Sequence, residues 1–590
     1  MSDAVLIFTF SPVQTFIAEA RRVSDLRAGS QTLVALARAA GTVLQQHGEL
    51  VYPANVDASQ DAPNKLVALV PWERAEAAVR AAQAALLAEW QRLAGAARER
   101  FRRDVGALAP QGDAIWEETW QRQTHTLWEV YWAAAAQDGC PYAEAYEQAS
   151  RAVEAAKRTR AFAPAEEPGL KDSLSGRRAA LHLAGQDARA YWLAASEAAP
   201  PARLRPGGRE RLDALGVIKR FSPLAEGARL ASTSTVASAD FLARARPHLA
   251  AYRSAVEALH PYKVRGDPDW PYDGDLLYRE TLTPARLQDS YGLQQPDDSA
   301  LERAREALHH LSREAGGPPS PYYAVLVLDG DDMGARVADG ARGGPAAHRR
   351  LSERLAAFAA GALAAMTPYE AQPVYAGGDD VLLLVPLARA LPLAQVLAQQ
   401  FFEVTGCTAS AGLAIAHHLY PLDATLQAAR AAEQRAKLVR GKAAVGVRVV
   451  RRSGETTDLR SPWAAMGDTF SALVELFRED RDGPPLSGRF AYEVVGIAAA
   501  LPAADARLEG ELRRLLGRHR QAGHPRAPAP DEWATRLRAW AAALGETTAQ
   551  EPDGHDPAGA PSEPAAAREA TSELGRWLVF ARFVAAGGRD

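Results

Sequence analysis

The residues best suited to chemistry lie in a short acidic stretch, VYAGGDDVLLLV, at positions 374–385. It places Gly377, Gly378, Asp379 and Asp380 between two apolar runs. Glycine and aspartate are also the residues that a tight hairpin turn prefers, so this stretch alone predicts a turn as readily as a metal site.

A second acidic segment favours the metal site. In LDGDDMG, at positions 328–334, Asp329 ends an apolar strand and Gly330 lets the backbone approach a ligand closely. If this strand and the hairpin are neighbours in one sheet, Asp329, Asp379 and Asp380 lie together. Clustered carboxylates repel one another unless cations neutralise them, and an all-oxygen ligand set selects Mg²⁺ or Mn²⁺ over zinc. Two such ions would support phosphoryl or nucleotidyl transfer.

Several polar residues around this acidic set have two interpretations. Lys437, Arg440 and Lys442 stand at the end of a predicted helix and in the turn after it, where they would bind a triphosphate or the last helix carbonyls. Asp331 and Asp332 would cap the following helix or support the metal ligands, and for Asp332 we prefer capping.

Histidine and cysteine add little to the metal hypothesis. His417 and His418 are adjacent, but without a third ligand at a suitable spacing we interpret them as turn or nucleotide-packing residues. Cys140 and Cys407 stand alone, so the sequence predicts neither a disulfide framework nor a cysteine zinc site.

The acidic residues need a sheet to bring them together, and the pattern from 322 to 452 predicts one. Strands and helices alternate there in the order β-α-β-β-α-β, with one extra helix, which is typical of a ferredoxin-like sheet of the palm type. The strands lie within 322–334, 371–386, 407–417 and 444–452, and the helices within 346–366, 391–405 and 422–439.

The remainder of the chain is predicted to be mainly helical. Strands are expected at 4–10 and 64–71, and helical periodicity runs from 73 to about 163. Five tryptophans in that stretch are predicted to lie in the core or to pack against a partner, with the core preferred: Trp90, Trp116, Trp120, Trp128 and Trp132. Linker-like segments at 164–169 and 316–321 and the composition of 546–567 complete the division. We predict an N-terminal palm-like domain with a helical insertion (1–170), a mainly helical domain (171–315), a GGDD palm domain (316–456) and a C-terminal helical domain (457–590) with a mobile loop at 546–567.

Length and charge limit the classes of function. The chain has 590 residues, too many for one core, and a net charge of -4. Such a charge gives no general attraction to nucleic acid or anionic membranes, so contact with RNA must be local or made through partners. No apolar stretch approaches the ~20 residues that span a bilayer, and no signal peptide is indicated, so we expect a soluble cytoplasmic protein.

An ordered set of motifs resembles a known family. The motifs FSPVQTFIAEARRVSDLRAGS, PNKLVALVP, LGVIKRF, STSTVA, VLDGDDMG, AGGDD, SAGLAIAHHLYPL and AAEQRAK follow one another as far as residue 437. Together they resemble the large polymerase/cyclase-like subunit of type III CRISPR effector complexes, in its Cmr branch (subtype III-B). The resemblance implies an α+β multidomain fold with two ferredoxin-like palm/nucleotide-cyclase-type domains, a helical insertion and a helical C-terminal domain.

The resemblance also implies an activity. Members of this family make cyclic oligoadenylates from ATP when their complex captures target RNA. By motif, Asp379 and Asp380 would be metal ligands with Asp329 as their partner acid, and the 3′-hydroxyl of one ATP would attack the α-phosphate of another. The implied partners are the other Cmr subunits, guide RNA and target RNA. Ser232 and Thr233 are candidates for a nucleotide contact, or alternatively for a helix N-cap.

Two departures from the family pattern qualify this expectation. The chain starts directly at the first palm-like segment, so we predict no HD nuclease activity. The helical insertion has Lys171-Asp172 where the family often has zinc cysteines, so no zinc is predicted. A palm-fold scaffold without catalysis is one alternative. A diguanylate-cyclase-like enzyme is another, although Val381 follows the acids where that family usually has phenylalanine.

Overall fold

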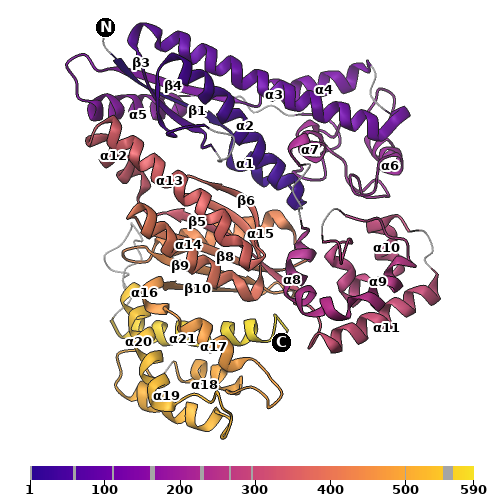
Figure 1. Cartoon of the computed structure of the whole chain (residues 1–590), viewed down its shortest axis with the longest axis vertical. Coiled ribbons are helices and arrows are strands. Elements are labelled where there is room, and N and C mark those ends of the chain that lie inside the picture. The colour runs from indigo at the N-terminus through magenta and orange to yellow at the C-terminus, as the bar shows by residue number, and fades with distance from the viewer. Residues whose placement is uncertain are drawn as a thin grey trace.

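The computed structural model describes residues 3–56, 62–108, 112–159, 167–225, 231–264, 267–293, 297–498, 500–548 and 563–589. Figure 1 shows two sheets, each covered by helices, with the N-terminal sheet at the top and the second sheet below it. Helices α8–α11 lie to one side of the second sheet, and the C-terminal helices lie beneath it. No helix among the described residues is long and apolar enough to cross a membrane.

The N-terminal sheet has four antiparallel strands in the order β2-β3-β1-β4. Its strands are β1 (Asp3–Ser11), β2 (Glu49–Tyr52), β3 (Lys65–Pro71) and β4 (Glu129–Ala136), and its helices are α1 (Gln14–Ala18), α2 (Val23–His47), α3 (Ala75–Val105), α4 (Ala114–His125) and α5 (Tyr142–Arg158). The alternating side chains of β1 separate two cores: Leu6 and Phe8 pack with α2 and α3, whereas Val5 and Ile7 pack with α5.

Strand β4 corrects the prediction of continuous helix from 73 to about 163. Its sequence, EVYWAAAA, has alanines that favour a helix, but every residue from Glu129 to Ala136 pairs with β1. Pairing across the sheet therefore overrides local propensity. The tryptophan prediction holds for Trp90, Trp116, Trp120 and Trp128, which are buried, but Trp132 on β4 is 39% exposed.

The second sheet has six strands in the order β10-β9-β8-β5-β7-β6. Four of them repeat the strand order of the N-terminal sheet, which confirms the predicted ferredoxin-like fold. The strands are β5 (Tyr322–Gly330), β6 (Gln372–Gly377), β7 (Asp380–Pro386), β8 (Ala409–His417), β9 (Ala444–Val450) and β10 (Thr456–Pro462), and the helices are α12 (Met333–Arg342), α13 (Pro345–Met366), α14 (Ala390–Thr405) and α15 (Leu422–Lys437). Strand β10 was not predicted; it extends the palm sheet into the segment expected to be wholly helical.

The two faces of the second sheet meet different neighbours. Leu326 and Leu383 pack with α13, α14 and the C-terminal helices, whereas Tyr323 and Val325 pack with α15 in a core that continues into the N-terminal domain. The C-terminal helices are α16 (Trp463–Met466), α17 (Thr469–Phe477), α18 (Arg489–Ile497), α19 (Arg507–His519), α20 (Pro530–Thr548) and α21 (Glu563–Ala585). Most of the predicted loop at 546–567 lies outside the described residues.

The segment 171–315 is divided between two hydrophobic cores. Helices α6 (Ala188–Ala198) and α7 (Ala214–Arg220) join the N-terminal core, whereas α9 (Leu249–Glu257), α10 (Pro284–Tyr291) and α11 (Asp298–Glu314) form a core of their own. Helix α8 (Thr233–Ala245) contributes Val236 to the first core and Phe241 to the second. This helix therefore links the two units.

A buried ion pair attaches α7 to the N-terminal domain. Arg220, in the motif LGVIKRF, donates two hydrogen bonds of 2.7 Å to the carboxylate of Asp25 on α2, and both side chains are at most 2% exposed. Glu210 also contacts Arg220, at 3.1 Å. Removing one partner of such a buried ion pair is costly, because the charge that remains is shielded from water.

We expect Asp25→Ala to lower the free energy of unfolding by ~3–5 kcal/mol. Glu76→Ala, which removes the exposed Glu76–Arg80 pair on α3, is the matched control and should cost less than ~1 kcal/mol. Differential scanning fluorimetry of the two variants checks this, with a clearly lower first transition expected for Asp25→Ala only. Equal, small shifts in both variants would contradict a structural role for this pair.

Candidate active site

The structure brings the two acidic segments together at one end of the second sheet. Strands β5 and β7 are antiparallel neighbours, and Asp329 and Asp380 are directly opposite each other in their register. The hairpin tip is attached to β5 by a 3.1 Å hydrogen bond from Gly330 N to Asp379 O. Asp329, Asp379 and Asp380 therefore share one site, as the sequence analysis expected.

Glycine is required at two positions for this approach. Gly378 has a φ of +65° in the hairpin turn, a conformation that L-residues with side chains rarely adopt. A Cβ on Gly330 would lie 2.6 Å from Met333 Cγ and 3.0 Å from Asp379 Cβ. Gly330 thus allows the hairpin, rather than a ligand, to approach β5. Gly377, the residue opposite Asp380, is buried at the end of β6.

The acids strongly affect one another. Burial, and then the charge of Asp329, raise the pKa of Asp379 to about 6 and that of Asp380 to about 7. Asp329 itself forms an ion pair with Lys437, whose ammonium also lies 2.8 Å from Glu433. Lys437 at the end of α15 therefore provides positive charge at the acidic site instead of capping helix carbonyls.

Two cavities meet at these acids. The larger, of about 830 Å³, and the smaller, of about 420 Å³, share the lining residues Asn64, Asp329, Tyr375 and Asp380. The larger cavity lies between β2, β3 and α5 of the N-terminal domain and α12, α13 and the hairpin of the second palm. The smaller lies between α2 and α15, and Lys437 and Arg430 line it. Both palm domains thus build the site.

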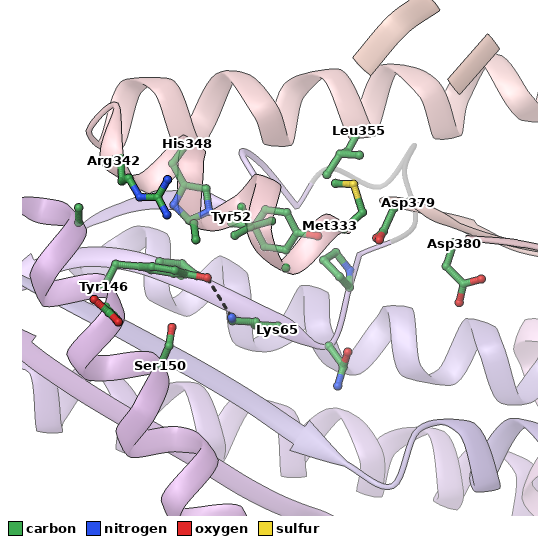
Figure 2. A pocket seen from close by; sticks show the side chains of 18 of the residues that line it. Tyr52, Lys65, Tyr146, Ser150, Met333, Arg342, His348, Leu355, Asp379 and Asp380 are labelled. Carbon is green, nitrogen blue, oxygen red and sulfur yellow. Dashed lines mark hydrogen bonds between the residues drawn. The ribbon is translucent and has the colours of Figure 1, made fainter. Parts of the chain in front are cut away.

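Figure 2 shows the wall that the N-terminal domain contributes to the larger cavity. Lys65 Nζ donates a 3.1 Å hydrogen bond to the Tyr146 hydroxyl, drawn as a dashed line in Figure 2. Tyr142 on α5 shares a 2.9 Å hydrogen bond with Nδ1 of His348 on α13 of the second palm. Burial, together with the charge of Lys65, lowers the pKa of His348 to about 4, so its imidazole is neutral. These residues were not predicted. Only the scarcity of lysine, with seven in the chain, could have pointed to Lys65.

The two aspartates after Gly330 have structural partners. Asp331 is buried and accepts hydrogen bonds from Ser410 Oγ at 2.8 Å and Ala443 N at 3.0 Å. Asp332 precedes α12 with a φ of +55°, but its side chain caps no backbone amide. It forms an ion pair of 2.5 Å with Lys442 instead. The preference for capping at Asp332 was therefore wrong, and Lys442 lines neither of the two cavities at the acids.

Ser232 and Thr233 lie away from the acids. Ser232 is the N-cap of α8 and accepts a hydrogen bond from Thr235 N at 3.1 Å, which confirms the alternative that the sequence left open. Thr233 Oγ1 donates to His418 O at 2.8 Å. His418 follows β8, whose residue His417 pairs with Tyr322 at the start of β5, whereas Asp329 is near the end of that strand. At ~3.3 Å per residue, the two ends are ~23 Å apart.

The arrangement of the acids fits a metal-binding role in donor type. All three offer carboxylate oxygens, as Mg²⁺ and Mn²⁺ prefer, and their mutual repulsion favours a bound cation. The set is open. Among the described residues, the sets of three potential ligands that lie within 4.8 Å of one another are Glu280–His417–His418 and Asp480–Asp482–His524. Asp329, Asp379 and Asp380 are spaced more widely, with Lys437 beside Asp329.

Both palm domains contain segments that match family models. Residues 322–446 match the model of the Cas10/Cmr2 second palm domain, and residues 5–95 match that of the CRISPR-associated protein Cmr2, N-terminal. Both segments are therefore similar to parts of the Cas10/Cmr2 family. The acidic hairpin and strand β5, which contains Asp329, both lie inside the matched segment 322–446.

Individual relatives agree with this family. The CRISPR system Cmr subunit Cmr2 of Pyrococcus furiosus is 28% identical over 284 residues, which are 42% of this chain and 32% of that relative. The match thus spans about a third of the relative's length. The chain is also similar in fold to a chain in the cryo-EM structure of Type III-B Cmr-beta in the apo state, with a TM-score of 0.67 and 13% identity over 100% of this chain and 82% of that one. For a chain in the cryo-EM structure of Type III-B Cmr-beta bound to cognate target RNA, the TM-score is 0.62, with 12% identity over 91% of this chain and 80% of that one.

The raised pKa values predict how the acids affect stability. When the pKa of a carboxyl is higher in the folded protein than in the unfolded chain, raising the pH from the lower pKa to the higher one destabilises the fold. The loss of stability is ~1.4 kcal/mol per unit of difference between the two pKa values. For Asp379 and Asp380 the interval runs from about 4 to about 6 and 7. We therefore expect Asp379→Asn with Asp380→Asn to raise the melting temperature of the metal-free chain at about pH 8 and much less at about pH 5.

Added Mg²⁺ should raise the melting temperature of the unsubstituted chain at about pH 8 and leave that of the double variant unchanged. Glu403→Gln, an exposed acid on α14, is the matched control and should behave like the unsubstituted chain. A Mg²⁺ effect of the same size in the double variant would show that these two acids do not bind the ion.

Proposed function

We propose that this chain is the nucleotidyltransferase subunit of an RNA-guided type III-B (Cmr) complex, and that it converts ATP to cyclic oligoadenylate when the complex captures target RNA. The observation that carries the proposal is the meeting of two cavities at Asp329 and Asp380. Joining two nucleotides requires two binding sites that share one reaction centre. The matches to the two family models and to the Cmr2 relative support the assembly with Cmr subunits, guide RNA and target RNA.

Each cavity has the features that a nucleotide needs. Their volumes, about 830 and 420 Å³, are of the order of small-molecule sites. Lys65 and Arg342 line the larger one and Arg430 and Lys437 the smaller one, so each offers two cationic side chains for phosphate groups. Tyr52, Tyr146 and Tyr375 provide aromatic surface near the acids. One nucleotide would present its 3′-hydroxyl and the other its α-phosphate to the shared centre.

Asp329, Asp379 and Asp380 would hold the catalytic cations, two Mg²⁺ or Mn²⁺ ions. When bound, such ions promote ionisation of an attacking hydroxyl and neutralise charge on the phosphate and the leaving pyrophosphate. The chain's own residues position the reactants: β5 and β7 fix the acids in register, and the two palm domains hold a nucleotide on each side. Lys437 keeps Asp329 neutralised before the ions arrive.

A catalytically silent scaffold is the second candidate, and the Lys437–Asp329 ion pair favours it. The pair reduces the cost of clustering the acids without a metal, so their presence alone does not require catalysis. A diguanylate-cyclase-like activity has less support. Val381, which follows the acids where that family usually has phenylalanine, is fully buried in the core, so the larger side chain would not fit there without repacking.

We expect the assembled complex to form oligoadenylate from radiolabelled ATP and Mg²⁺ only with matching target RNA. Asp379→Ala with Asp380→Ala should reduce the yield at least ~100-fold, because the acids act on the reacting phosphate itself. Glu403→Gln should keep full yield. GTP as the sole substrate should give no product. Target RNA binding without product in any of these reactions would establish the scaffold function. A product formed from GTP would establish the diguanylate-cyclase-like alternative.

Lys437→Ala provides a second test of the site. Loss of a charged hydrogen bond to a phosphate is worth ~1.5–3 kcal/mol, so kcat/KM for ATP should fall ~10–100-fold. Lys157→Ala, which removes an exposed lysine on α5, is the control and should leave kcat/KM unchanged. An unchanged kcat/KM in Lys437→Ala would limit this lysine to its ion pair with Asp329.

A further inference from the structure

Three potential metal ligands meet at the opposite end of the second sheet from the acidic site. They are Glu280 in the short helix η6 (Arg279–Thr281), His417 at the end of β8, and His418 after it. Each offers one ligand atom, and these atoms all lie within 4.8 Å of one another. The third ligand that the sequence around the two histidines lacks is therefore supplied from a distant segment of the chain.

One ring nitrogen of His418 has no hydrogen-bond partner among the described residues. Its Nδ1 lies 2.8 Å from Ser234 Oγ, and its ring stacks on Tyr278 with the ring centroids 4.0 Å apart. The residue is 2% exposed, and its Nε2 is buried without a hydrogen-bond partner among the described residues. A buried polar atom left unpaired costs ~1–3 kcal/mol, so a ligand on Nε2 would stabilise the fold.

The other two ligands are accessible for coordination. The Glu280 carboxylate is exposed, and no hydrogen bond or ion pair to it is found in the described part of the chain. His417 is buried, and its Nδ1 accepts a hydrogen bond of 3.2 Å from Leu419 N, which leaves Nε2 as the ring nitrogen for coordination. Burial lowers the pKa of both imidazoles, and the charge of Arg452 lowers both pKa values further. Arg286 also lowers the pKa of His418, whereas the charge of Glu280 raises that of His417.

We propose that Glu280, His417 and His418 bind a divalent transition-metal ion, with Zn²⁺ as the representative probe. Two imidazole nitrogens and one carboxylate oxygen suit Zn²⁺ and its neighbours in the first transition row rather than Mg²⁺. Three protein ligands leave a fourth, open position in a tetrahedral site. Ser234, through its hydrogen bond to Nδ1, is the positioning residue that directs Nε2 of His418 toward the ion.

The site would join two units of the fold. Glu280 belongs to the segment after α8 and α9, whereas both histidines belong to the second palm. Backbone and side-chain contacts already connect these units at the same place: His418 N donates to Pro321 O at 2.8 Å, and the Tyr278 hydroxyl donates to Ser320 O at 2.8 Å. A metal ion here would fix the linker at 316–321 and the helical unit to the palm.

The second such cluster, Asp480, Asp482 and His524, lacks these features. Arg526 Nη2 lies 2.5 Å from Asp480 Oδ2, and the His524 ring shares a hydrogen bond of 3.2 Å with the same carboxylate. The guanidinium and the imidazole therefore already satisfy the acid, and no proposal is based on that cluster.

The test uses the full chain without a purification tag, carrying Asp379→Asn and Asp380→Asn so that the acidic site does not contribute to zinc binding. The protein is stripped with a chelator, titrated with Zn²⁺ and assayed for bound zinc, affinity and melting temperature. We expect one tightly bound Zn²⁺ that raises the melting temperature. Glu280→Gln should weaken binding at least ~10-fold, and Ser234→Ala ~10–100-fold. Neither change removes the buried His418, so both variants should fold.

Two controls separate this site from adventitious binding. Glu306→Gln removes another exposed acid on α11, and His309→Gln removes a histidine that lines the same cavity as Glu280. Both should retain the zinc affinity of the parent chain. Zinc affinity unchanged in Glu280→Gln, or no zinc retained by the parent chain, would overturn the proposal. Co²⁺ substitution gives an independent readout, because a tetrahedral site produces visible absorption bands that Glu280→Gln should abolish.

Discussion

The pairing of Asp329 with Asp380 across two neighbouring strands is the constraint on which the rest of the structure depends. Like charges directly opposite in a sheet destabilise it, and partial burial increases that cost. Six other register pairs between β5 and β7, most of them buried aliphatic side chains, hold the strands against this repulsion. A slip of one residue would turn those side chains to the wrong face, so hydrophobic packing fixes where the carboxylates lie.

The two palm domains divide the tasks at the site. Their sheets share one strand order, but the second contributes the acids and the first contributes the basic and aromatic wall that includes Lys65 and Tyr146. The core beneath α15 continues from one domain into the other. Any shift of one palm relative to the other would therefore change the shape of both cavities while the register of the acids stayed the same.

Local patterns in the sequence predicted the elements whose structure depends on near neighbours. The buried run of β5, the hairpin and α14 were predicted because apolar periodicity and turn residues determine them. Strand β4 was missed because its alanines favour a helix and only pairing with β1 makes it a strand. For the same reason the sequence could place Asp329 near the hairpin but could not reveal the partner of Lys437, 108 residues away from Asp329. The neighbours of His418 depend on which end of the sheet it occupies, and this follows from the pairing of β8 with β5, which the sequence does not reveal.

Lys437 explains how the acidic site is tolerated before a cation binds. Its ammonium neutralises Asp329, and the remaining two acids reduce their charge by the upward shift in their pKa. A divalent ion at Asp329 would compete with this ammonium, and the lysine displaced from the carboxylate would remain on the wall of the smaller cavity. Metal binding and phosphate binding are then coupled through the side chain of Lys437. Without the ion its positive charge neutralises Asp329, and with the ion bound at Asp329 the same charge is available to the nucleotide phosphates.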